Sequence, residues 1–459
     1  MFSFFAHLFP LCNKEKQLRQ VEQFNFAHRT EFHYSSVYEA GMIRVFRWTL
    51  FSVLVGVLSG ISSSLFLILL DWATRFRDSH SQLIWALPII GFFIGWIFHH
   101  YGHDVSKGNN LIIDEIHDPQ KVVPLKMAPF ILGGTVLTHL FGGSAGREGT
   151  AVQMGASLAD QLSKIFRIEP EERKILLVAG AGSSFGAAIG APWAGVIFGM
   201  EVISIGRLQV FALFECLLAS FVAFYTTHFL NAPHSIFPPI EVHGYQGSTF
   251  FFVILAGLIF GLVARCFSAL VHFIEQVEGK ILRYAPLKPL IGGLILVFLY
   301  RLEGSFRYVG LGIPSIQEAL QQLVPFSEPV LKAIFTALTV ASGFKGGEFV
   351  PLVFIGATLG SAMSVFLPVS LSLLAALGFA AVFAGAANTP IACSIMAIEI
   401  FGLRIAPYAF VCCFMSYYFS GHQGIYKAQK VHRKKHYKML SILSWFGELP
   451  RRFLNGSGE

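Results

Sequence analysis

Arg147 and Glu148 lie together in the glycine-rich stretch GGSAGREGT, residues 142–150, of a chain that is otherwise strongly apolar. The glycines interrupt regular structure, and the glutamate stands where a helix is predicted to begin. A helix N-terminus exposes unpaired N–H groups and a partial positive charge, which together bind anions. A glutamate at this position competes with an anion for the same N–H groups. Protonation of Glu148 removes that competition, so the pattern predicts a link between anion binding and proton binding.

A second loop of the same kind occurs later in the chain. Gly146-Arg147-Glu148 is matched by Gly346-Gly347-Glu348, at an offset of 200 residues (346 − 146). Three further matches keep the same order at nearly the same offset: TVLT (135–138) with TALT (336–339), GASL (155–158) with GATL (356–359), and Pro192, Ala194 and Glu201 with Pro390, Ala392 and Glu399. The constant order indicates an internal duplication.

The elements that position these loops are predicted to be membrane helices. The chain has 459 residues, of which 54% are hydrophobic and 13% are charged, whereas soluble domains have about 25% charged residues. Uncharged runs occur at 48–70, 83–98, 175–200, 208–229 (interrupted only by Glu215), 250–264, 290–300 and 349–398. The last run is long enough for more than one helix, because a membrane span needs about 20 residues. Many runs are short or broken by Gly and Pro, which predicts tilted, half-length and re-entrant helices, and no sheet.

Charged residues predict the orientation in the membrane. Lys and Arg gather near both termini and at 280–288, whereas the linker 231–247 has neither. The positive-inside rule then makes both termini cytoplasmic and the linker external, so the two repeats are inverted and their binding site lies near the midplane. The predicted organisation is a cytoplasmic amphipathic segment (1–45), a first membrane repeat (46–230), an external linker (231–247), a second membrane repeat (248–438) and a short cytoplasmic tail without a regulatory domain (439–459).

Several classes of function are not expected. The net charge of +7 comes largely from the flanks, so it does not indicate a nucleic-acid partner. The six cysteines are scattered apart from the adjacent Cys412 and Cys413, and the histidines have no metal-ligand spacing. The sequence contains no recognisable nucleophile or phosphate-binding loop. We therefore predict no enzyme activity, no catalytic centre, no metal and no cofactor.

GREGT, residues 146–150, resembles the gating-glutamate motif of the CLC family of chloride channels and proton-coupled anion transporters. The resemblance covers residues 45–438, and the family's other motifs have counterparts in order: SKGNN (106–110), GAAIGAPWAGVIFGME (186–201), GFKGGEFVP (343–351) and GHQGIY (421–426). It implies an all-α polytopic membrane protein of two inverted repeats. It also implies a homodimer in the lipid bilayer, in a bacterial-type inner or plasma membrane, with one complete anion pathway per subunit.

Four positions depart from the chloride-type or fluoride-type pattern. Lys107 stands where chloride-type members have a serine that contacts the ion, and Val202 stands where proton-coupled members have an inner glutamate. Glu348 replaces an isoleucine or similar residue of chloride-type members. The segments GNN, GREGT and GFKGGE together resemble the fluoride-exporting branch, although Val350 replaces the threonine that is common there.

The resemblance also implies the residues of the site. Glu148 is the gating and proton-binding acid, and Glu348 is a second acid for protons or anion. The implied anion-binding residues are Lys107, Gly108, Asn109, Asn110, Gly146, Arg147, Gly149, Thr150, Gly346, Gly347, Phe349, Val350 and Tyr426. Fluoride is small and strongly hydrated, so its dehydration needs short donor contacts of the kind that amide, phenol and backbone N–H groups supply. The same residues also suit chloride.

Some of these residues have alternative, structural interpretations. Arg147 is also suited to tie loop carbonyls together, and Lys107 to extend along the apolar surface to the cytoplasmic face. Asn109 and Asn110 are suited to cap a helix that begins at Leu111.

Three other acids are also ambiguous. Glu201 and Glu399 fit the role of structural acids at helix ends. Glu215 fits either a proton relay or a hydrogen-bonded position at a subunit interface.

The sequence therefore predicts CLC-type transport of a halide anion with protons, with fluoride/proton antiport as the first hypothesis. A chloride channel or a chloride/proton antiporter of the same fold is the alternative. An unrelated inverted-repeat carrier is a more distant one, because the glycine-rich loops leave little room for an organic substrate.

Overall fold

The computed structural model describes residues 30–241 and 245–435, with side chains from residue 42 onward. Most of the predicted N-terminal segment 1–45, and all of the predicted tail 439–459, lie outside the described residues. The chain divides into two units, one ending at Leu50 and one beginning at Phe51. Helix α1 begins in the first unit, and every other element belongs to the second.

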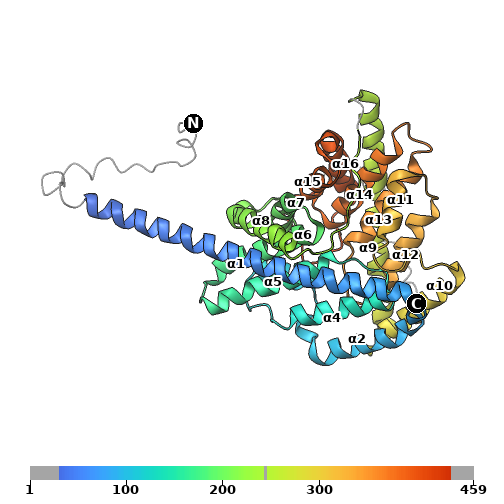
Figure 1. The fold of residues 1–459 in the computed structure, drawn as a ribbon, viewed down its shortest axis with the longest axis horizontal. Helices are drawn as coiled ribbons and strands as arrows, with labels where there is room; N and C mark the ends of the chain where they lie inside the picture. Colours follow the sequence, from blue (N-terminus) through green and yellow to red (C-terminus); the bar gives the residue numbers. More distant parts are fainter. Residues whose placement is uncertain (1–29, 242–244, 436–459) are drawn as a thin grey trace, which may run out of the picture. The chain divides into compact units, whose positions relative to one another are not determined.

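The described residues form two successive sets of eight helices, most of which are labelled in Figure 1. The first set is α1 (Thr30–Ser79), α2 (Leu87–Tyr101), α3 (Asn109–His117), α4 (Met127–Leu140), α5 (Glu148–Ile165), α6 (Pro170–Ile189), α7 (Pro192–Glu201) and α8 (Leu213–Phe229). The second set is α9 (Gly247–Ile281), α10 (Leu287–Glu303), α11 (Ile313–Gln321), α12 (Ser327–Ala341), α13 (Phe349–Met363), α14 (Leu371–Ala387), α15 (Pro390–Phe401) and α16 (Ala406–Phe419). Short 3₁₀ turns are η2 (Ser81–Ala86), η3 (His103–Val105), η4 (Val210–Ala212) and η5 (Leu403–Ile405).

The lengths of the helices agree with the predicted mixture of full and partial spans. Among the described residues, four helical segments are long and apolar enough to cross a membrane, at Met42–Ser79, Ser81–Tyr101, Val210–Phe229 and Gly247–Ile281. Others, such as α4 and α13 to α15, have 10 to 17 residues. The uncharged run 349–398 contains α13, α14 and most of α15, as its length predicted.

The same local sequence device separates neighbouring helices in both repeats. Gly190 ends α6 in the left-handed region at φ 85°, and Asn388 ends α14 there at φ 60°. Pro192 and Pro390 then begin the next helices. A left-handed residue followed by proline stops one helix and starts another, because proline cannot continue the first helix but fits the first turn of the next.

The expectation that no sheet forms is wrong in one detail. Strand β1 (Ser204–Ile205) pairs in parallel with β2 (Lys430–Val431), so a two-stranded sheet of two residues per strand joins the segments that follow α7 and α16. Lipid excludes unpaired strand edges, but this restriction applies only to lipid-exposed backbone, and β1 is buried in protein. The fold is otherwise helical.

Helices α7 and α15 join the two repeats through hydrogen bonds between the end of each helix and the start of the other. The Glu201 carboxylate at the end of α7 accepts hydrogen bonds from the N–H groups of Ile391 (3.0 Å) and Ala392 (2.8 Å) at the start of α15. Glu399 near the end of α15 accepts from Trp193 (2.9 Å) and Ala194 (2.8 Å) at the start of α7.

Each acid therefore satisfies the free N–H groups of the opposite helix, which requires that the two helices run antiparallel. The structural interpretation of both acids at helix ends is confirmed.

Candidate anion and proton site

The two glycine loops are hydrogen-bonded directly to each other. The Gly146 N–H donates to the Gly347 carbonyl at 2.5 Å, and the Gly347 N–H donates to the Gly146 carbonyl at 2.8 Å. A Cβ atom added to Gly347 would lie 2.8 Å from the Gly149 nitrogen, and one added to Gly149 would lie 3.2 Å from the Gly347 Cα atom. Only glycine allows this approach, so the loops meet and α5 and α13 begin beside each other.

Glu148 is the first residue of α5 and is 1% exposed. Its carboxylate accepts hydrogen bonds from the backbone N–H and the Nε group of Arg147, both at 3.2 Å. Arg147 also donates from Nη2 to the hydroxyl of Ser235 at 3.1 Å. A buried carboxylate requires such a charged partner, so Arg147 is the residue that holds Glu148 in place.

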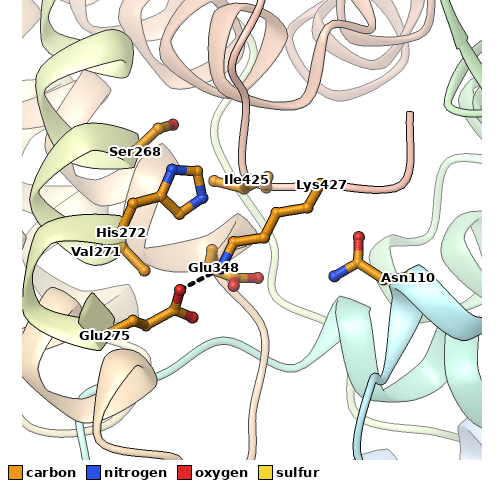
Figure 2. Close-up of a pocket in the computed structure, with 8 residues that line it drawn as sticks. All are labelled: Asn110, Ser268, Val271, His272, Glu275, Glu348, Ile425 and Lys427. Atoms are coloured by element: carbon orange, nitrogen blue, oxygen red, sulfur yellow. Dashed lines mark hydrogen bonds and ion pairs between the residues drawn. The ribbon is translucent and has the colours of Figure 1, made fainter. Parts of the chain in front are cut away.

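Glu348 immediately precedes α13 and has different surroundings (Figure 2). It lines a cavity of about 90 Å³ together with Asn110, Ser268, Val271, His272, Glu275, Ile425 and Lys427. Within the part of the chain that the structure describes, its carboxylate has no ion pair and no hydrogen bond to another side chain. The second acid is therefore available to water in this cavity.

Glu148 lines a separate and smaller cavity of about 20 Å³. The other residues of this cavity are Arg147, Ile189, Ser235, Phe237, Ile313, Ile316, Phe349, Val350, Val353 and Phe379. Most of them are apolar, and none is shared with the cavity at Glu348. The loops of Glu148 and Glu348 are thus in contact through Gly146 and Gly347, but the two acids line different cavities.

The third predicted loop, 106–110, also reaches the site. Helix α3 begins at Asn109 rather than Leu111, and no side chain caps it, so the capping interpretation of Asn109 and Asn110 is wrong. The Asn110 Oδ1 atom instead accepts a hydrogen bond from the N–H of Ala428 at 2.9 Å. The Asn109 amide lies against Gly149, and its Oδ1 atom is buried without a hydrogen-bond partner. Because Gly149 belongs to the first turn of α5, the Asn109 amide lies at the start of that helix.

The remaining predicted residues of the first repeat differ in their contacts and in their exposure to solvent. Lys107 is exposed over 65% of its side chain and pairs with Asp114 at 3.1 Å. Gly108 precedes α3 with φ 59° and adjoins the Gln153 amide. The hydroxyl of Thr150 is buried and hydrogen-bonded to that of Thr135 at 2.8 Å. Lys107 is thus the predicted residue that is most open to solvent.

Residues of the second repeat complete the centre. Gly346 has φ 153°, and a side chain there would meet the Cβ atom of Ala145 at 2.5 Å. Phe349 is buried and packs edge-on against Phe383, with ring centroids 4.7 Å apart. Tyr426 is 9% exposed and lies between Ile425 and Lys427, which line the cavity at Glu348. Tyr426 therefore lies beside the larger cavity.

Among the polar or charged residues that line the two cavities, the sequence analysis missed five: Ser235, Ser268, His272, Glu275 and Lys427. The last three carry a signal in the sequence. His272 and Glu275 interrupt the apolar pattern of α9, and Lys427 directly follows Tyr426. Ser235 has no such signal, because a serine in a linker is ordinary.

Comparison with known proteins now identifies the family. A family model described as voltage gated chloride channel matches residues 90–421. The chain belongs to the CLC family. A chloride/fluoride channel protein of Pseudomonas syringae pv. tomato is 45% identical over 400 residues, which cover 86% of this chain and 88% of that protein. An H(+)/Cl(−) exchange transporter, ClcA of Yersinia pestis, is 25% identical over 384 residues, covering 76% and 79% of the two chains.

Solved CLC structures share the fold. The crystal structure of a CLC-type fluoride/proton antiporter matches with a TM-score of 0.82 and 34% identity, over 85% of this chain and 99% of that chain. A slow cyanobacterial Cl⁻/H⁺ antiporter matches with a TM-score of 0.74 and 20% identity, over 83% and 96%. The predicted CLC fold, the membrane location and anion transport are thereby confirmed for this chain.

Proposed function

We propose that this chain is a fluoride/proton antiporter that exports fluoride. The observation that carries the proposal is the contact between Gly146 and Gly347, from which Glu148 enters one cavity and Glu348 another. One anion position is then reached by two acids from different cavities. This arrangement supports exchange, because each acid can exchange a proton with its own cavity. The two cavities then need not be open at the same time.

The anion binds where α5 and α13 begin side by side. Both helices offer N–H groups and the positive ends of their dipoles at this place. The Asn109 amide and the Tyr426 hydroxyl add two side-chain donors. Fluoride accepts short hydrogen bonds strongly, so a set of small neutral donors around glycine suits it better than a wide pocket would.

Proton coupling follows from competition at the start of α5. The ionised Glu148 carboxylate occupies this place and pairs with Arg147. Protonation removes the negative charge, releases the acid from Arg147 and admits an anion in its place. Glu348 supplies or accepts the proton from the larger cavity, since Val202 provides no acid between Glu148 and that side.

The two cavities are proposed to face opposite sides of the membrane. The smaller cavity includes Ser235 and Phe237 of the linker that lacks Lys and Arg, so it opens outward. The larger cavity includes Lys427, close to the basic C-terminal segment, so it opens to the cytoplasm. This orientation keeps both termini cytoplasmic in an inner or plasma membrane. Membership of the CLC family supports the further proposal that two copies form a homodimer with one pathway each.

The test uses the purified protein in liposomes. Efflux of fluoride and of chloride is compared, with and without a proton gradient, while the pH of the lumen is recorded. We expect fluoride to leave faster than chloride by a wide margin and to drive protons against their gradient. Equal or faster chloride efflux with proton movement would instead identify a chloride/proton antiporter, and anion efflux without proton movement would identify a channel.

The chloride alternative has one specific observation in its favour. Val350, rather than threonine, lines the smaller cavity beside Glu148, which removes a hydroxyl donor from the anion position. Chloride is larger and more weakly hydrated, so it tolerates this loss better than fluoride does.

A further inference from the structure

The cavity at Glu348 contains a second group of ionisable side chains. Lys427 forms an ion pair with Glu275, and the two side chains are 55% and 36% exposed. His272 lies one helical turn before Glu275 on α9, and both line the same cavity as Lys427. Figure 2 displays Lys427 reaching across the cavity to Glu275, with Glu348 between this pair and Asn110.

One face of α9 connects the exposed and buried ends of this cavity. Ser268, His272 and Glu275 follow one another at spacings of four and three residues, so they lie on the same side of the helix. Glu275 is partly exposed, His272 is half-buried and Ser268 is 2% exposed. A cavity of about 90 Å³ lined by such polar groups is large enough for several water molecules.

We propose that His272, Glu275 and Lys427 form the entrance through which protons reach Glu348 from the adjoining solution. This proposal rests on the proposed proton antiport and extends it to the step for which Val202 offers no acid. Glu275 takes a proton from water at the mouth of the cavity, and its ion pair with Lys427 then opens. His272 accepts the proton on one ring nitrogen and releases one from the other to cavity water, which protonates the Glu348 carboxylate.

Other charged groups near the cavity have partners of their own or lie outside it. Glu278, on the next turn of α9, accepts a hydrogen bond from Ser342 at 2.6 Å and does not line the cavity. Tyr426 precedes Lys427 in the same segment and does not line the cavity. In the part of the chain that the structure describes, the neutral Asn110 is the α3 residue that lines the cavity, and His272, Glu275 and Lys427 are the ionisable residues that line it besides Glu348.

The test measures fluoride-driven proton transport in liposomes at several values of the pH on the cavity side. We expect Glu275→Gln and His272→Gln each to slow it by about tenfold or more at alkaline pH, in the range of lost acid–base groups. The defect should shrink at acidic pH, where water protonates Glu348 directly. Glu275→Asp should restore most of the rate.

Glu318→Gln is the matched control. Glu318 pairs with Arg307 and is 32% exposed, similar to Glu275, but it does not line the cavity. We expect this variant to transport like the wild type at every pH.

The outcomes separate this proposal from the proposed function. A wild-type protein that moves no protons overturns the antiport itself. If the wild type couples fluoride to protons while Glu275→Gln and His272→Gln keep its rate and pH profile, only the entrance is assigned wrongly. A uniform loss that is independent of pH and is not rescued by Glu275→Asp also overturns it, because that is the effect of a structural role.

Discussion

Glu148 and Glu348 occupy matching positions in the two repeats but have opposite surroundings. Glu148 is buried, paired with Arg147, and lines a small and mainly apolar cavity. Among the described residues Glu348 has no such partner, and it lines the larger cavity with charged groups at its mouth. The preceding residue makes much of this difference, since Arg147 corresponds to Gly347 in the repeat. The two repeats therefore have similar helix starts, but an arginine precedes the acid in the first repeat and a glycine precedes it in the second.

The largest effect is expected when the two glycine loops at Glu148 and Glu348 are forced apart. Gly347→Val places a side chain about where the Gly149 nitrogen now lies, at 2.8 Å from the added Cβ atom. We expect loss of transport and a large fall in the yield of folded protein, measured by flux and by size-exclusion chromatography. Gly133→Ala is the control, because a Cβ atom there meets nothing within 4 Å. Equal behaviour of the two variants would show that the loop contact is not required.

The next largest effect is expected at Glu148. Glu148→Gln resembles the protonated acid and cannot titrate, so proton coupling should disappear. Anion flux either continues passively or stops if the site requires the acid itself. The measurement is proton movement driven by an anion gradient, and uphill proton transport by this variant would remove Glu148 from the gating role.

A smaller but still clear effect is expected at Glu348. Glu348→Gln should impair both proton-coupled flux and anion throughput, because it removes the acid that faces the larger cavity. Glu215→Gln should leave both nearly intact, since Glu215 lies in the first turn of α8 and lines neither cavity. Parallel flux assays on the two variants decide this, and an inactive Glu215→Gln beside a normal Glu348→Gln would move the proton route to α8.

The smallest effect is expected at Lys107. Both side chains of its ion pair with Asp114 are exposed. Such pairs contribute about 1 kcal/mol or less to stability. Lys107→Gln should therefore change fluoride flux by about twofold at most, a change that low salt enlarges because screening weakens. A much larger loss in the same efflux assay would place Lys107 in the anion pathway. The loop 106–110 would then be as important for transport as the loops of Glu148 and Glu348.

The repeat, the class of fold and the two helix-start glutamates are readable from the sequence alone. Glycine runs, the Pro192 and Pro390 starts and the matched glutamates are local features that act through backbone conformation, so they can be read without knowing the fold. The helix starts at Glu148 and beside Glu348 followed from these rules. Even the structural role of Glu201 and Glu399 was predictable from their position at the ends of apolar segments.

The contacts between residues that are distant in the chain are known from the tertiary structure and not from the sequence. The bond between Gly146 and Gly347, the partner of Arg147 in the linker, and the cavity formed by α9 with Lys427 each join residues that lie far apart in the chain. Local pattern also placed Asn109 and Asn110 as helix caps, whereas contact with Ala428 and Gly149 gave their side chains other surroundings. Side-chain contacts between distant segments depend on how the helices pack, and the periodicity of one segment carries no information about its neighbours.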